Sequence, residues 1–180
     1  MFVKICDNQS VGVVIGDEHG RLLLFDRATF PSGAAPAAGH VDDHGTPEQT
    51  ARAEVAEELG LVVRGLEMIA ERWRSNQCRR VPGLRGIGHY WTVFRATAEG
   101  VLAPCARETR NVRWCTSDEV GRLAERTVRY AQGHLSADEF AVAPGLEPVW
   151  LRWFADLGIV TVPERHLALV DSAMRPSTTC

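Results

Sequence analysis

The sequence predicts a layered α/β or α+β domain, because strand and helix patterns mix along the chain and the helices gather toward its C-terminal third. Short apolar runs bounded by Gly and polar residues indicate strands, and residues placed to cap helices mark several helix starts. The 180 residues, 45% of them hydrophobic, suffice for one sizeable core. We therefore expect a single domain over residues 1–180, in which 134–180 form a helical C-terminal extension.

The N-terminal part of the chain has the pattern of a β-hairpin. An apolar, β-branched run at 13–15 is followed by a polar turn at 16–20 and a second apolar run at 22–25. The stretch 28–45 holds too many Gly and Pro residues for a stable helix, so we expect a loop there.

A helix over 47–59 is the clearest element in the sequence. Thr46 is placed as the N-cap, Pro47 as the first helical residue and Gln49 as the partner in a capping box. Gly60 is placed to end the helix in a left-handed conformation.

Weaker patterns indicate the remaining elements. An arginine-rich stretch with Gly and Pro at 72–88 is expected to be a long loop or hairpin tip. The other expected elements are a strand starting at 61–63, strands at 89–96 and 112–115, and helices from Thr116 toward 132, from Ser136, and over 147–157.

Composition excludes several classes of protein. The net charge of −3 does not favour nucleic acid or an anionic membrane as a partner. Five scattered cysteines without a C-x-x-C pair argue against a disulfide framework and a zinc ribbon. The first ten residues lack the apolar core of a signal peptide, and no run reaches the ~20 apolar residues of a membrane span. A cytoplasmic protein with reduced thiols is expected.

Three glutamates on the predicted helix form the strongest chemical pattern. Glu54, Glu57 and Glu58 stand at i, i+3 and i+4 and share one helix face, where like charges repel. The neighbouring stripe, Ala51, Val55 and Leu59, suits a core. A solvated acidic face would be the ordinary explanation for three such residues alone. Clustered carboxylates are also what Mg²⁺ or Mn²⁺ binds.

The surrounding residues resemble the Nudix box, whose pattern is G-x5-E-x7-R-E-U-x-E-E-x-G-U with U aliphatic. The resemblance runs from Gly39 to Leu61 with its spacing intact. Glu54-Val55, Glu57-Glu58 and Gly60-Leu61 take the three conserved pairs of the pattern. Gly45 and Ala53 depart from it, because they stand where the family has Glu and Arg. In the family these two positions look like a loop-to-helix ion pair, so the departure bears on loop rigidity and rate more than on a metal site.

The resemblance implies a Nudix-type α/β/α sandwich with a mixed sheet, here with additional C-terminal helices. It also implies a hydrolase dependent on Mg²⁺ or Mn²⁺ that cleaves a diphosphate linkage in a nucleotide or nucleoside-diphosphate derivative. By this resemblance the metal ligands are the Gly39 carbonyl, Glu57 and Glu58, with Glu54 a ligand or an orienting carboxylate. Glu58 is the best single candidate for base or essential ligand. Glu108 is the nearest acidic alternative, because Asn111 stands where many members have a later Glu.

Candidates for substrate contacts are less specific. Arg27 follows the second predicted strand, where a guanidinium could hold a phosphate bidentately. Arg72 opens the arginine-rich stretch, and His40 lies inside the box; a solvated loop and a polar turn explain these two equally well. The helices from Ser136 onward could shape the substrate pocket or a homodimer interface. The expected partner is a small diphosphate compound, neither nucleic acid nor membrane, and the sequence does not say which compound.

Two other functions fit the same fold. A Nudix-fold module that binds a nucleotide with little catalysis is favoured slightly by Gly45 and Ala53 and opposed by the three retained glutamates. A diphosphate isomerase uses a related fold, but no residue in this chain supports that reaction.

Overall fold

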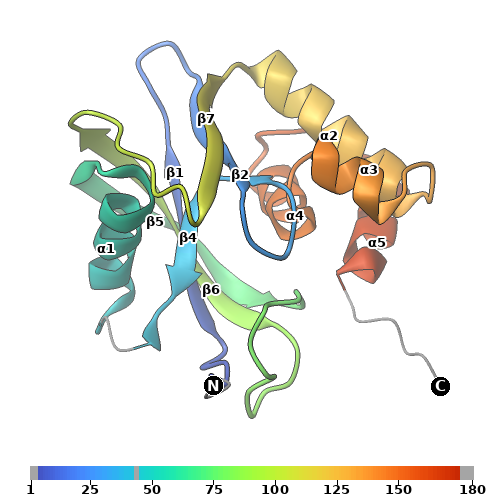
Figure 1. Cartoon of the computed structure of the whole chain (residues 1–180), viewed down its shortest axis with the longest axis horizontal. Coiled ribbons are helices and arrows are strands. Elements are labelled where there is room, and N and C mark those ends of the chain that lie inside the picture. The colour runs from blue at the N-terminus through green and yellow to red at the C-terminus, as the bar shows by residue number, and fades with distance from the viewer. Residues whose placement is uncertain (1–3, 43–44, 175–180) are drawn as a thin grey trace.

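The computed structural model describes residues 4–42 and 45–174. Two sheets form its centre, with one helix on one side and the C-terminal helices on the other (Figure 1). This arrangement confirms the predicted mixed α/β architecture and places the core in two apolar clusters, one toward each helical layer. None of the described helices has the length and apolar character that crossing a bilayer requires.

The larger sheet has four strands in the order β4-β1-β6-β5. Strands β1 and β6 run parallel, whereas β4 and β5 pair antiparallel with their neighbours, so the sheet is mixed as expected. The strands span Ala37–His40 (β4), Gln9–Ile15 (β1), His89–Glu99 (β6) and Val62–Arg74 (β5).

The smaller, antiparallel sheet has the order β3-β2-β7, with β3 at Ala34–Ala35, β2 at Leu22–Arg27 and β7 at Thr109–Cys115. The prediction of an N-terminal hairpin was therefore wrong in its pairing. Strands β1 and β2 exist, but after the single bridge between Gly16 and Leu22 they diverge into different sheets. Each strand finds its partners in distant segments, which a local turn pattern cannot reveal.

Two predicted loops are shorter than expected. The stretch 28–45 contains β3 and β4, because its small residues pair as short strands instead of remaining irregular. The arginine-rich stretch begins inside β5, which continues to Arg74, so the loop covers only 75–88. From Gly65 on, half-buried and exposed residues follow one another in pairs along this bulged edge strand, and Arg64 and Arg72 take exposed positions.

Helix α1 spans Pro47–Leu59, as predicted. The Thr46–Gln49 capping box forms, and Gly60 ends the helix with a left-handed φ of 72°. Ala51, Val55 and Leu59 are buried against the larger sheet, which confirms the apolar stripe. The position of α1 is therefore determined by local caps at both ends and by one apolar face.

Four helices cover the other side (Figure 1). They are α2 at Ser117–Ala131, α3 at Ala137–Val142, α4 at Pro148–Asp156 and α5 at Glu164–Ala173. The centre of this layer is Trp150, which is fully buried against Gly12 of β1; a Cβ at Gly12 would overlap the indole ring. Helices thus dominate the expected extension over 134–180, although 175–180 lie outside the described residues and α5 had no predicted counterpart.

Candidate active site

One cavity of about 300 Å³ collects the predicted carboxylates. Glu54, Glu57 and Glu58 reach it from α1, Gly39 from β4 and Glu108 from the segment before β7. Glu57 is exposed to solvent, whereas Glu58 is buried, with 4% of its surface exposed. The structure therefore brings together five predicted residues that sequence alone could relate only through the box and the order of elements.

Glu58 is held by the fold at both its side chain and its backbone. Its Oε2 accepts a 3.0 Å hydrogen bond from the Ala38 N–H, and its backbone carbonyl accepts one of 3.0 Å from the Cys105 N–H. Glu108 in turn donates its backbone N–H to the Cys105 carbonyl at 2.9 Å. The helix end thus positions the segment that carries Glu108. Burial, reinforced by the Glu54 charge, raises the pKa of Glu58 well above its ordinary value.

Glu54 lies directly against Gly39, because a Cβ on that glycine would overlap the Glu54 carboxylate. Burial and the charges of Glu57 and Glu108 raise the pKa of Glu54 to about 7. The cavity therefore concentrates more negative charge than its protein surroundings can stabilise.

This donor set fits a hard divalent cation. Carboxylate oxygens and a backbone carbonyl are the ligands that Mg²⁺ and Mn²⁺ prefer. A cation would favour the ionised forms of Glu54 and Glu58, which burial alone disfavours. The missing side chain at Gly39 leaves room for the Glu54 carboxylate beside the backbone.

Basic side chains line other parts of the same cavity. Arg80 makes a bidentate pair with Asp42, with both N–O distances 2.7 Å, and Lys4 joins the same carboxylate at 2.8 Å. These contacts hold the pKa of Asp42 well below its usual range, since the Arg80 hydrogen bonds favour the charged form. Arg79 lies 3.9 Å from Glu108 and remains largely exposed. Sequence reasoning assigned no role to Lys4 or Asp42, and no local motif marks them.

The three residues predicted to contact substrate differ in their position relative to the cavity. Arg27 lines the cavity, where its guanidinium lies 3.5 Å from the buried carboxylate of Glu147. Arg72 does not line it: its guanidinium lies 3.5 Å from Asp156 and 5.8 Å from the Trp153 ring centre. The prediction for Arg72 was therefore wrong in placement, because the residue belongs to β5 and packs on α4.

His40 lines the cavity wall, but its Nε2 faces two protein groups. That nitrogen lies 3.5 Å from Cys6 Sγ and 3.2 Å from His89 Nε2. Burial, together with the charges of Arg80 and His89, lowers the pKa of His40 to about 4. A neutral ring turned toward Cys6 and His89 is a weaker candidate for holding phosphate than the arginines.

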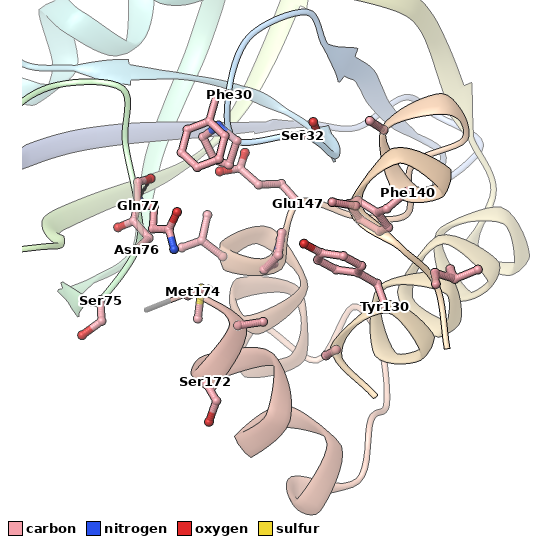
Figure 2. A pocket seen from close by; sticks show the side chains of 18 of the residues that line it. Phe30, Ser32, Ser75, Asn76, Gln77, Tyr130, Phe140, Glu147, Ser172 and Met174 are labelled. Carbon is pink, nitrogen blue, oxygen red and sulfur yellow. Dashed lines mark hydrogen bonds between the residues drawn. The ribbon is translucent and has the colours of Figure 1, made fainter. Parts of the chain in front are cut away.

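A second cavity, of about 1290 Å³, adjoins the first. Figure 2 shows Phe30, Asn76 and Gln77 at one side and Tyr130 with Phe140 at another. The Tyr130 and Phe140 rings stack with centroids 4.4 Å apart. The residues common to both cavities are Phe30, Pro31, Asn76, Gln77 and Glu147. A ligand with charge at one end and a large group at the other would fit the two spaces together.

The two departures from the box have a local explanation. Gly45 has a φ of +99°, which residues with a side chain rarely adopt, and a Cβ there would overlap the Gln49 side chain. Gln49 is itself engaged in the capping box with Thr46. The helix start is thus fixed by the capping box in place of an ion pair involving residue 53.

Comparisons with known proteins agree with this geometry. The human protein described as NAD(P)H pyrophosphatase NUDT13, mitochondrial, is 30% identical over 138 residues, which are 76% of this chain and 37% of that protein. The chain thus spans little more than a third of the relative's length. The MutT NUDIX hydrolase of Burkholderia pseudomallei superposes with a TM-score of 0.52 at 19% identity, over 64% of this chain and 86% of that one. The NUDIX domain of Shewanella oneidensis NrtR, solved with ADP ribose, superposes with a TM-score of 0.51 at 20% identity, over 66% of this chain and 77% of that one. The family model of the NUDIX domain matches residues 7–137, and this chain therefore belongs to the Nudix family.

Proposed function

We propose that this protein is a divalent-metal-dependent hydrolase that cleaves the diphosphate linkage of a nucleoside-diphosphate derivative. The observation that carries the proposal is one cavity lined by buried Glu58 and half-buried Glu54, both with raised pKa values, by a third carboxylate, Glu108, and by arginine side chains. Such a site can bind a cation and the phosphates of a substrate together.

The helix residues would hold the metal. Glu57, Glu58 and the Gly39 carbonyl are the proposed ligands, with Glu54 as a further ligand or orienting carboxylate. The metal, Mg²⁺ or Mn²⁺, would supply neutralisation of phosphate charge and a water of lowered pKa. Arg27 and Arg79 are the proposed ligands of phosphate oxygens, which their position in the cavity lining supports.

Two carboxylates are candidates for the general base. Glu54 lies against Gly39 in the cavity, and without metal its pKa is raised to about 7; a bound cation would favour its ionised form, which is the form a base needs. Glu108 comes from a separate segment, so it could accept a proton while the glutamates of α1 hold the metal. The pH profiles of Glu54→Gln and Glu108→Gln decide between them: loss of the base removes the acidic limb of kcat against pH.

The neighbouring cavity favours a substrate with a large group beyond the diphosphate. Tyr130, which is half-buried and stacks on the buried Phe140, offers aromatic surface to such a group. The human relative is named for action on NAD(P)H, which has this two-part form. Dinucleotides and ADP-ribose are therefore the first compounds to test, ahead of nucleoside triphosphates.

The experiment incubates purified protein with NADH, NAD⁺, ADP-ribose, nucleotide sugars and nucleoside triphosphates, in Mg²⁺, in Mn²⁺ and in chelator. We expect metal-dependent cleavage that is lost in Glu58→Gln and retained in Glu48→Gln, which removes an exposed carboxylate of the same helix outside the cavity.

A nucleotide-binding module is the second candidate, because Gly45 and Ala53 remove the ion pair of the box. Absence of cleavage, combined with a nucleotide that raises the melting temperature, would replace the hydrolase with this module.

A further inference from the structure

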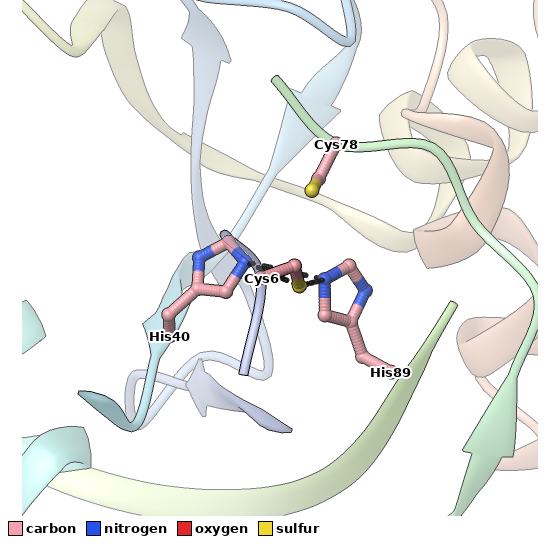
Figure 3. A group of neighbouring side chains, drawn as sticks. All are labelled: Cys6, His40, Cys78 and His89. Atoms are coloured by element: carbon pink, nitrogen blue, oxygen red, sulfur yellow. Dashed lines mark hydrogen bonds between the residues drawn. The ribbon is translucent and has the colours of Figure 1, made fainter. Parts of the chain in front are cut away.

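Beside the carboxylate cavity lies a second group of metal-ligating side chains that plays no part in the proposed hydrolysis. Cys6, His40, Cys78 and His89 each direct one ligand atom to a common point, and these four atoms lie within 4.8 Å of one another (Figure 3). No carboxylate belongs to this group. Its donors are two sulfurs and two imidazole nitrogens, a softer set than the one on α1.

The distances within the group suit a tetrahedral ion. Cys6 Sγ lies 3.1 Å from His89 Nε2 and 3.5 Å from His40 Nε2, and the two nitrogens are 3.2 Å apart. An ion with bonds of about 2.3 Å to sulfur and about 2.0 Å to nitrogen separates its tetrahedral ligands by about 3.3 to 3.8 Å. The Cys6, His40 and His89 atoms therefore lie close to the spacing that Zn²⁺ requires, and Cys78 Sγ, within 4.8 Å of the other three, would complete the set by moving closer.

His89 is oriented as a metal ligand. Asn76 Oδ1 accepts a hydrogen bond from Trp91 Nε1 at 3.2 Å, which identifies this atom as the amide oxygen. The His89 Nδ1, 2.8 Å away, must then donate to it and carry the ring proton. In the neutral ring this leaves the lone pair of Nε2 directed at the cluster. A carbonyl that fixes the far nitrogen in this way is the usual support of a zinc-bound histidine.

Both cysteines also have the support that thiolates need. The Asn8 N–H donates to Cys6 Sγ at 3.3 Å, and the Arg80 N–H donates to Cys78 Sγ at 3.4 Å. In each case the donor stands two residues after the cysteine, so two separate segments fold into the same local turn around a sulfur. Backbone donors stabilise negative charge on sulfur.

The four residues come from four separate segments: the N-terminal segment before β1, the end of β4, the 75–88 loop and the start of β6. Backbone bonds between Cys6 and Val81 already join the first and third of these. Cys78 immediately precedes Arg79 and Arg80, which line the carboxylate cavity. An ion here would fix the loop that presents those arginines.

We propose that Cys6, His40, Cys78 and His89 form a structural Zn²⁺ site that ties the N-terminal segment and the 75–88 loop to the sheet. Four protein ligands leave no open position for water or substrate, which is typical of structural rather than catalytic zinc. His40, Cys78 and His89 also line the carboxylate cavity, but their sulfur and imidazole donors differ from the carboxylate oxygens on α1 and take a different class of metal.

The test measures metal in the full chain, expressed in zinc-supplemented medium and purified under reducing conditions. We expect one zinc per chain by mass spectrometry of the metal. The metal-free protein titrated with Co²⁺ should show intense visible bands of a tetrahedral ion and a thiolate-to-cobalt charge-transfer band. Wild type alone can overturn the proposal: no bound zinc and no such cobalt spectrum, with Cys6 and Cys78 reduced, would exclude the site. A Cys6–Cys78 disulfide found by peptide mass spectrometry in metal-free protein would equally replace it.

Variants assign the ligands. Cys6→Ser and His89→Gln should lose zinc, while Cys78→His should keep a tetrahedral ion with a weaker charge-transfer band. Cys105→Ser is the matched control, since it removes a cysteine outside the group. It should leave the zinc content and the cobalt spectrum unchanged. Glu58→Gln should retain zinc while hydrolysis is lost, so the two proposals can fail separately. A cobalt spectrum that disappears in Glu58→Gln would place the metal on α1 and refute the Cys–His site.

Discussion

The Ala38 N–H donates a 3.0 Å hydrogen bond to Oε2 of Glu58 and so joins strand β4 to helix α1 beside the carboxylate cavity. The Glu58 carboxylate therefore stabilises the contact between strand and helix and is also a proposed metal ligand. Stability and metal binding can be separated by choosing the substitution.

Glu58→Gln should keep the fold and lose the metal. The amide oxygen can still accept from Ala38, while the buried charge, whose pKa is raised well above the ordinary value, is removed. In chelator at pH 8 we expect the variant to match or exceed wild type in free energy of unfolding, measured by urea denaturation. Glu58→Ala should instead lose about 1–3 kcal/mol, because the Ala38 donor is left unpaired. Equal losses in both variants would show that the hydrogen bond contributes little.

The raised pKa of Glu54 predicts a pH dependence of stability in the absence of metal. The folded-state value is about 7 and the ordinary value 4.5, so the folded protein binds this proton more tightly than the unfolded chain. The corresponding stability is fully present below pH 4.5 and is lost as pH rises through about 7, by about 3 kcal/mol. Urea denaturation in chelator between pH 6.5 and 8 should show this decline. At lower pH His40 and His89, whose pKa values are lowered to about 4, add a change of the opposite sign.

Glu54→Gln should flatten part of that decline, and Glu58 should account for much of the remainder because its pKa is shifted in the same direction. Stabilisation by Mg²⁺ should be largest at the alkaline end, where the carboxylates are ionised. A stability that rises with pH in chelator above pH 6.5, where His40 and His89 are neutral in both states, would contradict the assignment of raised pKa values to this pair.

Gly39→Ala should impair catalysis more than folding. The added Cβ overlaps the Glu54 carboxylate, which is the end of a flexible side chain and can move aside. Displacing a catalytic group by about 1 Å can cost on the order of 100-fold in rate, so we expect a loss of that size in kcat. The melting temperature should change little. Gly16→Ala is the control, because nothing lies closer than 3.7 Å to its new Cβ; a similar loss of rate there would point to a general effect of the substitution.

The elements predicted well are those determined by neighbouring residues. Helix α1 has both caps and its apolar stripe within fifteen residues of sequence, and α2 likewise begins at the Thr116 capping box. The triple glutamate belongs to one helix, so its spacing alone places the three side chains on one face. The carboxylate face of the site was therefore predictable.

The features that were missed depend on contacts between distant segments. Strands β1 and β2 look like a hairpin locally, but their partners lie in β6 and β7. The Cys–His group joins residues 6, 40, 78 and 89, and no local spacing resembles a zinc motif. Arg72 was assigned to a loop because the arginine-rich stretch 72–88 contains Gly and Pro, whereas the residue takes an exposed position on the edge strand β5.

The buried pair of Arg27 and Glu147 gives a final prediction. The side chains are 20% and 4% exposed and lie 3.5 Å apart, with no hydrogen-bond partner for Glu147 Oε2 among the described residues. Burial raises the pKa of Glu147, and the Arg27 charge opposes that rise. Arg27→Met should remove the opposing charge and destabilise the protein by about 3–5 kcal/mol at neutral pH, as breaking a buried pair does.

The double variant Arg27→Met/Glu147→Gln should recover most of that stability, because no unpaired charge remains buried. The loss in the single variant should also shrink as pH falls and Glu147 becomes protonated. Urea denaturation of wild type, both single variants and the double variant completes the cycle. If the double variant is as unstable as Arg27→Met, the packing of the Arg27 side chain, and not its charge, maintains this wall of the cavity. In that case the Arg27 guanidinium could bind phosphate without lowering the free energy of unfolding, and the effect of Arg27→Met on KM would be the measurement of its role.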